Sequence, residues 1–257
     1  MKQLLFLGVG TIARALRASL PSLPAFGTTR SAPDARFVEI TPLADANAIR
    51  AAARGAGVVV SFPPDGHSDA EFVRLIADAA SIVYLSSTAV YPADAGLVNE
   101  TTPVATQGER AMRRLAAEAL WRDLGASIVR LPAFYGPESG LHLSIARGTF
   151  RMPERGTNIV SRVHVDDAAR FVAAALNAPP RSFILAGDDA PAPLAEVVAF
   201  VCDLFGLDRP QPSEGADIPL SLRGSRSIDN SATKARFGVR LAYPTYRDGY
   251  RAIRGPG

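Results

Sequence analysis

The sequence predicts an α/β fold of the doubly wound kind, a parallel sheet with helices on both faces, together with a small C-terminal subdomain. Short apolar, branched or aromatic runs alternate with longer segments of helical period, which is typical of parallel strands joined by crossover helices. The first run passes directly into a glycine-rich turn and a helix. The alternation breaks at residues 137–160, which are rich in Gly, Arg and Pro, so we expect that stretch to leave the sheet.

The two periodicities place the individual elements along the chain. Six runs predict strands, at residues 2–10, 35–40, 56–64, 81–92, 126–136 and 182–188. A further short strand ends in "FGTTRS", residues 26–31. Apolar residues at helical spacing predict helices over 12–20, 46–55, 70–80, 105–120 and 162–176, followed by a mixed region that contains residues 193–207 and by a tail over 243–253.

We expect two structural parts. Residues 1–136 and 158–182 form the domain that carries the parallel sheet, and residues 137–157 and 183–257 form the smaller subdomain. Ligands of doubly wound proteins bind at the carboxyl ends of the strands. The subdomain is therefore expected to fold over those ends and to supply the substrate side of a site.

Composition excludes several classes of protein. The chain has 257 residues, 47% of them hydrophobic and 21% charged, which is ordinary for a globular domain and argues against disorder. The net charge is only +3 and the arginines are interspersed with acids, so we expect no nucleic-acid partner. Glycine interrupts the first apolar run and no signal cleavage site follows it, so we expect a cytoplasmic protein without a membrane partner. The single cysteine, Cys202, lies among apolar neighbours and is expected to be a buried thiol, with no metal site.

The first strand ends in a G-x-G-x-x-A pattern formed by Gly8, Gly10 and Ala13. The first glycine permits a tight turn, the second lets the backbone approach a pyrophosphate, and the small third residue lets the helix pack on the strand. The N-terminus of the helix, with Thr11 and Ile12, adds free amides and a partial positive charge. This position in the chain favours a dinucleotide site over a turn without a ligand.

The end of the second strand indicates which dinucleotide is bound. An NAD-binding protein usually has Asp or Glu about twenty residues after the first glycine. This chain has Thr28, Thr29 and Arg30 there, and a guanidinium with neighbouring hydroxyls suits a 2′-phosphate. The sequence therefore favours NADP over NAD, with a plain surface arginine as the alternative.

Hydroxyl groups gather at the end of the strand over residues 81–92. Ser86, Ser87 and Thr88 lie where a substrate would meet a nicotinamide, and a hydroxyl there can bond a substrate oxygen as hydride moves. The alternative is that these side chains only cap the next turn. The loop "SFPPDGH", which contains Pro63 and a solvent-facing His67, is expected to lie against the ribose and pyrophosphate.

Taken together, the motifs resemble those of the extended and atypical short-chain dehydrogenase/reductase superfamily, in the group of NAD-dependent epimerase/dehydratase-like proteins. The segments "GVGTIA", "YLSSTAVYP", "NETTP", "VRLPAFYGP", "RVHVDDAA" and "YPTYRDGYRAI" follow in that family's order and spacing. The resemblance implies a Rossmann fold that binds NAD(P) and a C-terminal lobe that forms the substrate pocket. It also implies a sugar nucleotide or another small hydroxyl or carbonyl compound as substrate. Ser87, four residues before Tyr91, matches the family's catalytic Ser or Thr.

The chain departs from the family at the general acid. Relatives use a Tyr-x-x-x-Lys pair on the helix that follows, where the lysine lowers the tyrosine pKa and holds the nicotinamide ribose. Here no Tyr is followed by Lys at that spacing, and Lys2 and Lys234, the two lysines, lie elsewhere. One register puts Arg110 and Arg114 at the Tyr and Lys positions. The other register, aligned on Gly108, puts Gln107 and Ala111 there.

The helix over 105–120 therefore raises a question about its arginines. Arg114 could hold ribose hydroxyls in place of the lysine, and Arg110 could bind an anionic group of the substrate. Neither can donate a proton as tyrosine does, because arginine stays charged. The alternative is an exposed helix face with the pairs Glu109–Arg113 and Arg114–Glu118. The apolar stripe expected to face the sheet is Met112, Leu115, Ala116 and Ala119.

Other side chains offer a proton donor or a structural role. Tyr91 and Tyr135 lie at strand ends and could supply the missing acid, although aromatic packing is the main alternative for Tyr135. His164, Asp166 and Asp167 are spaced as a helix start with an Asp cap, rather than as a relay or metal site.

The expected function is that of an NADP-dependent oxidoreductase or epimerase of atypical type, acting on a small hydroxyl or carbonyl substrate such as a sugar nucleotide or another anionic metabolite. In this reading Ser87 orients the reacting oxygen. The alternative is a catalytically silent NADP(H)-binding protein that senses redox state. A homodimer is left open.

Overall fold

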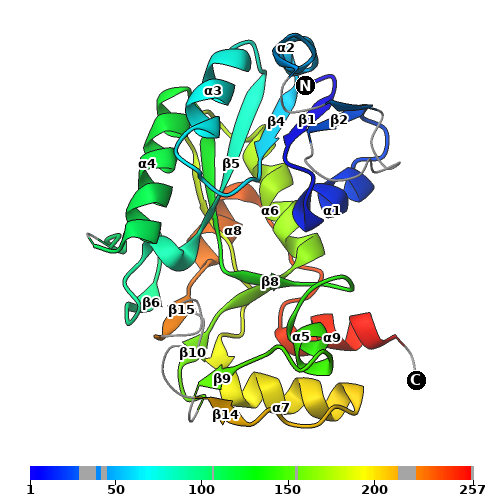
Figure 1. Cartoon of the computed structure of the whole chain (residues 1–257), viewed down its shortest axis with the longest axis vertical. Helices are drawn as coiled ribbons and strands as arrows, with labels where there is room; N and C mark the ends of the chain where they lie inside the picture. Colours follow the sequence, from blue (N-terminus) through cyan, green and yellow to red (C-terminus); the bar gives the residue numbers. More distant parts are fainter. Residues whose placement is uncertain (29–38, 42–44, 106, 154–155, 214–223, 256–257) are drawn as a thin grey trace.

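A computed structural model describes residues 1–28, 39–41, 45–105, 107–153, 156–213 and 224–255 (Figure 1). Its main sheet has seven parallel strands in the order β12-β7-β5-β4-β1-β2-β3. Their bounds are β1 (Leu4–Leu7), β2 (Ala25–Thr28), β3 (Glu39–Thr41), β4 (Gly57–Val60), β5 (Ser81–Ser87), β7 (Ser127–Leu131) and β12 (Phe183–Leu185). The predicted Rossmann-type fold is confirmed. The strand order reverses between β1 and β4, which is where such sheets bind ligands.

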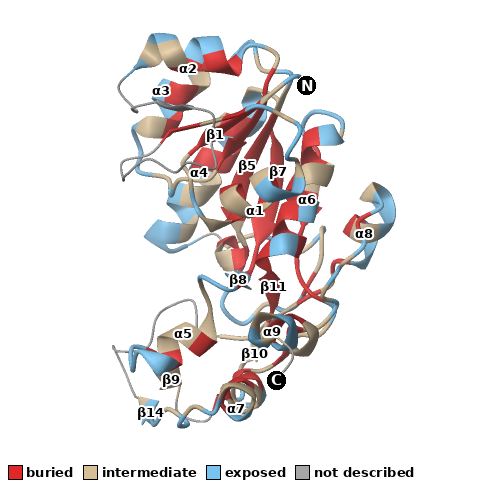
Figure 2. Ribbon diagram, turned by 90° about the vertical axis from the view of Figure 1, so that its right-hand side faces the viewer, coloured by how far each residue is buried: buried red, intermediate tan, exposed pale blue. Residues whose placement is uncertain are grey.

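Helices cover both faces of the sheet, whose strands are largely buried (Figure 2). Side chains along each strand alternate between the two layers. On one face Leu4 and Phe6 pack towards α1 and α6, and on the other Leu5 and Leu7 pack towards α2, α3 and α4. The helix bounds are α1 (Thr11–Ser19), α6 (Val165–Asn177), α2 (Ala46–Ala53), α3 (Ser68–Leu75) and α4 (Glu109–Asp123). Every strand residue from Leu4 to Leu7 is buried because it serves one of the two layers.

The buried face of α4 differs from the expected one. Met112 is 46% exposed, and Ala116 and Ala119 are also exposed, so the predicted stripe was wrong apart from the half-buried Leu115. The helix instead buries its Ala117, Glu118 and Trp121. Trp121 decides this, because its ring stacks on Tyr84 and its indole N–H donates to the buried carboxylate of Asp69 at 2.7 Å. The predicted segment stopped at residue 120, one position before this anchor.

The smaller lobe lies beyond the carboxyl ends of the strands, in the lower part of Figure 1. Its helices are α5 (Leu141–Ala146), α7 (Leu194–Phe205) and α9 (Tyr246–Arg254). Its short strands are β8 (Ala133–Tyr135), β9 (Met152–Pro153), β10 (Ile159–Val160), β11 (Arg162–His164), β13 (Ala192–Pro193) and β14 (Pro212–Ser213). A separate core holds them together, built mainly by α7 with Tyr135, Tyr246 and Tyr250. The stretch over 137–160 leaves the sheet as expected.

The chain after residue 182 does not belong wholly to the lobe. β12 is an edge strand of the main sheet, paired with β7. The remaining elements near the sheet end are η1 (Thr88–Val90), β6 (Gly96–Val98), β15 (Arg226–Ile228) and α8 (Ser231–Phe237). After α8, Val239 packs with the α1–α6 layer. The sequence division at 183 therefore cuts through the sheet, because the strand over 182–188 was predicted but its pairing with β7 is not visible in the local pattern.

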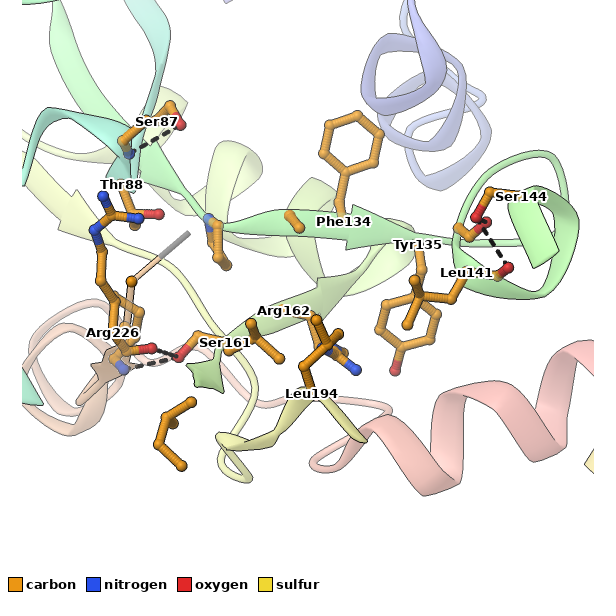
Figure 3. A pocket seen from close by; sticks show the side chains of 18 of the residues that line it. Ser87, Thr88, Phe134, Tyr135, Leu141, Ser144, Ser161, Arg162, Leu194 and Arg226 are labelled. Carbon is orange, nitrogen blue, oxygen red and sulfur yellow. Dashed lines mark hydrogen bonds between the residues drawn. The ribbon is translucent and has the colours of Figure 1, made fainter. Parts of the chain in front are cut away.

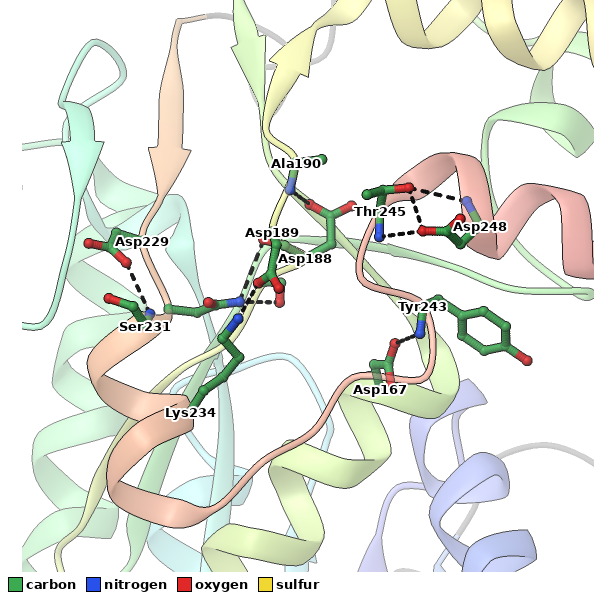
Figure 4. Close-up of polar contacts among 12 residues, drawn as sticks. Asp167, Asp188, Asp189, Ala190, Asp229, Ser231, Lys234, Tyr243, Thr245 and Asp248 are labelled. Atoms are coloured by element: carbon green, nitrogen blue, oxygen red, sulfur yellow. Dashed lines mark hydrogen bonds and ion pairs between the residues drawn. The ribbon is translucent and has the colours of Figure 1, made fainter.

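Polar contacts fix the segment that returns from the sheet to the lobe (Figure 4). Asp167, buried at the start of α6, accepts hydrogen bonds from the amides of Ala242 at 2.7 Å and Tyr243 at 2.9 Å. Lys234 pairs with Asp189 at 2.5 Å. Thr245 and Asp248 then form a reciprocal cap that starts α9. These contacts lead the chain back into the lobe, where α9 begins.

Among the residues described, no helix is both long and apolar enough to span a bilayer.

Candidate functional site

The glycine turn after β1 has the geometry that a dinucleotide needs. Gly8 has a φ of +95°, where a side chain would be strained, and its amide donates to Thr28 Oγ1 at 3.0 Å. A Cβ at Gly10 would meet nothing within 4 Å, so the backbone is open to a ligand. No side chain caps the first turn of α1 and no acid lies in it, while Ala13 is fully buried against the sheet. This arrangement fits a bound pyrophosphate.

A cleft of about 240 Å³ opens in front of this turn, and we call it the glycine cleft. It is lined by Gly10, Thr11, Ile12, Ala13, Ser61, Phe62, Pro63, Leu85, Ser86, Ser87, Arg114, Leu131, Pro132 and Phe134. Six of the nine residues expected to bind cofactor are therefore brought together in one cleft. Gly8 forms the turn behind it. Thr29 and Arg30 lie outside the described residues, so the structure leaves their role in cofactor choice a prediction.

A second cavity, which we call the lobe cavity, has a volume of about 440 Å³ and lies between the sheet and the smaller lobe (Figure 3). Its lining is Ser87, Thr88, Ala89, Pro132, Ala133, Phe134, Tyr135, Gly140, Leu141, Ser144, Ile159, Val160, Ser161, Arg162, Leu194, Gly224, Arg226, Ile228 and Tyr250. That volume is in the range of small-molecule sites. Ser87, Pro132 and Phe134 line both hollows, so the two meet at these residues.

The serines at the end of β5 have different partners. Ser86 Oγ is buried and hydrogen-bonds to Glu118 of α4. Ser87 Oγ accepts a hydrogen bond from the amide of Ala89 at 3.1 Å and so caps η1. The capping interpretation of Ser87 is therefore correct as far as its acceptor is concerned. That bond does not use the hydroxyl proton of Ser87, and Ser87 lines both hollows.

The two arginines of α4 have separate positions. Arg114 lines the glycine cleft, and its guanidinium lies 3.5 Å from the carbonyl oxygen of Leu85. Arg110 is exposed and lines neither the glycine cleft nor the lobe cavity, so its expected position beside a substrate is wrong. Arg110 lies in the first turn of α4, which starts at Glu109 with Gly108 as its cap, and its side chain is exposed there. Glu109 pairs with Arg113 on the surface, as expected.

Glu118 does not pair with Arg114 but with Arg130, and this contact was missed from the sequence. Arg130 is buried in the middle of β7, and its Nε and Nη2 donate to the two carboxylate oxygens at 2.9 and 2.7 Å. Its Nη1 donates to the hydroxyl of Tyr91 at 3.0 Å. Burial alone would lower the pKa of Arg130, but its bonds with Glu118 outweigh that effect and raise it. A charged residue inside an apolar strand was the available signal, because such a residue needs a buried partner.

Neither tyrosine is placed to act as an exposed acid. Tyr91 is 1% exposed and lines neither hollow, so its expected catalytic position is wrong; it is packed behind β5 by Arg130. Tyr135 lines the lobe cavity, but its ring stacks on Tyr250 and its buried hydroxyl lies against Gly249. Burial raises the pKa of both phenols above the ordinary value, which makes ionisation harder.

The remaining candidates have structural positions. His164 Nδ1, rather than an Asp, caps α6 by accepting from the amide of Asp166 at 3.2 Å. Desolvation lowers the pKa of His164 and favours this neutral acceptor form. His67 is exposed, and Cys202 is buried with a raised pKa caused by that burial. Across the described residues, no group of three or more His, Cys, Asp or Glu is arranged to hold a metal ion.

Comparison with known proteins agrees with this arrangement. A family profile described as "NAD dependent epimerase/dehydratase family" matches residues 69–186. The fold is similar to that of a functionally unknown conserved protein from Silicibacter pomeroyi DSS, at 30% identity, a TM-score of 0.86 and coverage of 99% of this chain and 98% of that one. It is also similar to UDP-glucuronic acid 4-epimerase from Bacillus cereus in complex with UDP-glucuronic acid and NAD, at 14% identity, a TM-score of 0.78 and 98% coverage of both chains.

One curated protein, a 3-diazoavenalumate denitrifying reductase from a Streptomyces species, is 27% identical over 152 residues. The match covers 54% of this chain and 49% of that protein, so the chain spans about half the length of the curated relative.

Proposed function

Because the chain belongs to the NAD-dependent epimerase/dehydratase family, we propose that it is an NADP(H)-dependent oxidoreductase acting on a small hydroxyl or carbonyl compound. The observation that carries the proposal is the junction at Ser87, which lines both the glycine cleft and the lobe cavity. A dinucleotide held in the first would meet a substrate held in the second at this residue. Such contact between two binding spaces is what hydride transfer requires.

The residues of the glycine cleft have distinct tasks in this proposal. The amides at the start of α1 hold the pyrophosphate, and Pro63 packs against the bound nucleotide. The nicotinamide supplies or accepts the hydride. Arg114 replaces the lysine of relatives by placing a permanent positive charge beside the ribose.

Ser87 handles the substrate oxygen. Because its Oγ accepts from the Ala89 amide, its proton is directed to another acceptor, and the substrate oxygen at the junction is the acceptor we assign. The Tyr-x-x-x-Lys pair is missing and both candidate phenols are buried, so proton delivery falls to Ser87 together with solvent. This chemistry is slower than that of a tuned phenol, which has a pKa closer to neutrality than a serine hydroxyl.

We propose reduction as the direction of the reaction, with NADPH as the donor. The curated relative from Streptomyces is named a reductase, which favours reduction. The Bacillus cereus complex contains NAD, and the preference for NADP proposed here rests on Arg30 and the lack of an acid in "FGTTRS".

The test of cofactor choice is a pair of titrations with NADPH and NADH, followed by nicotinamide fluorescence. Wild type is expected to bind NADPH more tightly. Arg30→Ala should lose about 1.5 to 3 kcal/mol of NADPH affinity and little NADH affinity, because it removes a charge-assisted phosphate contact. Arg113→Ala is the matched control, since Arg113 is exposed and pairs with Glu109 on the surface. Tighter NADH binding by wild type would reject the assignment.

The test of the reaction is NADPH oxidation with a panel of small aldehydes, ketones and keto acids. Turnover that requires Ser87 supports an oxidoreductase. A second candidate is a silent NADP(H)-binding sensor, favoured by the missing pair and by the buried phenols of Tyr91 and Tyr135. Tight NADPH binding without oxidation by any carbonyl compound would favour that candidate.

A further inference from the structure

The walls of the lobe cavity are mostly apolar, and most of their polar groups are already engaged. Ser144 Oγ donates to the carbonyl oxygen of Leu141 at 3.0 Å. Ser161 Oγ donates to the carbonyl of Arg226 at 3.1 Å and accepts from the amide of Ile228 at 2.8 Å. These hydroxyls hold the walls together and have little capacity left for a ligand.

Arg226, one of two arginines in the lining, is also engaged. Its Nε donates to the carbonyl oxygen of Pro92 at 2.9 Å and its Nη2 to that of Tyr91 at 3.3 Å. Burial lowers the pKa of this half-buried guanidinium. Arg226 therefore fastens β15 to the loop after η1 and offers little to a ligand.

Arg162 is different. It is 6% exposed, opens β11 opposite Ala133 of β8, and lines the cavity. Its guanidinium makes no hydrogen bond to any residue that the structure describes, and its Nη1 is buried without a partner. The guanidinium carbon lies 5.5 Å from the centre of the Tyr246 ring. A buried arginine that stays charged and lacks a hydrogen-bonded acceptor is costly unless something completes it.

Asp188 is the residue of this chain that is considered as a counter-charge for the Arg162 guanidinium. It interacts with the arginine electrostatically, but no ion pair joins the two among the described residues, and its Oδ1 accepts from the amide of Ala190 at 3.3 Å. Burial raises the pKa of Asp188 to about 7, so it is only a partial counter-charge near neutrality. Asp188 is not part of the cavity lining, whereas Arg162 is. Arg162 therefore lines the cavity without a full counter-charge from the described part of the chain.

We infer that the substrate is an apolar carboxylate, with its acid group held by Arg162 and its reacting oxygen at Ser87. Figure 3 shows these two side chains on separate walls of one cavity, with apolar side chains between them. A carboxylate matches one guanidinium in charge and in fork geometry, while the apolar walls match a hydrocarbon body. The placement of the reacting end rests on the proposed function. The anion site itself does not.

The experiment compares two ligands that differ only in charge, 3-phenylpropanoate and its neutral analogue 3-phenylpropanamide. Each is titrated calorimetrically into wild type, with and without saturating NADP. We expect the carboxylate to bind about 10- to 100-fold more tightly than the amide, as one charge-assisted contact allows. In Arg162→Met this preference should disappear while the amide affinity stays within a few-fold.

Three further variants keep the test decisive. Arg113→Met removes an exposed charge and should keep the preference, so a change in net charge is not the cause. Arg162→Lys should keep part of the preference for the carboxylate over the amide. If Arg162→Met does not fold because Asp188 is left alone, the double variant with Asp188→Asn removes both charges and should lose the preference.

The outcomes are clear. Equal affinity of wild type for the two ligands, including no binding of either, overturns the inference, as does a preference that survives in a folded variant lacking Arg162. Tighter binding of UDP-glucose than of the carboxylate would also overturn it. NADPH titration of the same samples reports separately on the proposed function, so a protein that prefers carboxylates but binds no nucleotide would reject that function alone.

Discussion

The glycine cleft has two walls built in opposite ways. The turn after β1, residues 8–13, presents backbone amides next to two glycines, and no side chain caps the helix that follows. The facing wall, formed by β5, α4 and β7, presents side chains joined by a buried chain of contacts from Ser86 through Glu118 and Arg130 to Tyr91. One wall depends on a short local pattern, and the other depends on partners up to 39 positions apart.

The difference shows where a family can change its chemistry without losing its cofactor. A backbone site tolerates changes elsewhere, because main-chain amides make the contacts with the ligand. A side-chain wall can be rebuilt, and here the Tyr-x-x-x-Lys pair is absent while Arg114 lies at the cleft. The turn keeps the fold's binding function, whereas the wall decides what reaction follows.

The largest effect is expected from replacing Arg130, which tests whether the buried contacts support the side-chain wall of the glycine cleft. Arg130→Met should lower the free energy of unfolding by about 3 to 5 kcal/mol, because the Glu118 carboxylate is left buried without its partner. Gly10→Ala on the opposite wall should change stability little, since its Cβ meets nothing within 4 Å. Denaturant unfolding of both variants measures this. Equal stability of Arg130→Met and wild type would show that the buried chain does not support the wall.

Removing the Ser87 hydroxyl tests whether the side-chain wall of the glycine cleft determines the rate of the reaction. Ser87→Ala should lower kcat by about 10²-fold while NADPH affinity stays unchanged, because in the proposed reaction the hydroxyl contacts the substrate oxygen. Ser144→Ala, which removes a cavity hydroxyl already bound to backbone carbonyls, is the control and should stay near wild type. Steady-state kinetics on the best carbonyl substrate gives the answer. An unchanged rate would leave Ser87 as a turn cap.

A third prediction concerns how the stability of the protein depends on pH through Asp188. Asp188 has a folded-state pKa of about 7, raised by burial from an ordinary 3.8, so its stabilising contribution is full below about pH 4 and is lost as pH rises through about 7. Asp188→Asn should therefore gain stability relative to wild type as pH rises from about 5 to 8. Thermal melts across that range measure the difference. The control Asp229→Asn should not show this gain, because its hydrogen bonds with Ser231 lower the pKa of Asp229. A difference in Tm between Asp188→Asn and wild type that does not vary with pH would contradict the assignment.

The smallest expected effect separates the two arginines of α4. Arg114→Ala should weaken NADPH binding by about 10-fold, because Arg114 lines the glycine cleft. Arg110→Ala, made four residues earlier on the same helix, should bind NADPH as wild type does, since Arg110 is exposed. Fluorescence titration compares them directly. A loss of NADPH affinity in Arg110→Ala but not in Arg114→Ala would contradict the position of Arg114 beside the nucleotide.

The sequence predicted what depends on local pattern. The G-x-G-x-x-A turn, the alternation of strands and helices and the cleft position of Ser86 and Ser87 follow from spacing within short windows, and the structure places them together. Local sequence pattern could not reveal the position of Arg162 or the Glu118–Arg130 pair, because both depend on contacts with other strands and helices. The α4 stripe was wrong because Trp121, beyond the window, sets the buried face.

The spread of the lobe cavity along the chain has a consequence for biosynthesis. The turn after β1 and the strands β1, β2 and β4 lie within residues 4–60, but the lobe cavity is complete only when Tyr250 of α9 packs on Tyr135. A nascent chain can therefore form this part of the sheet early, while the lobe cavity stays open until α9 emerges and docks. Translation order thus delays the cavity until almost the whole described chain is in place.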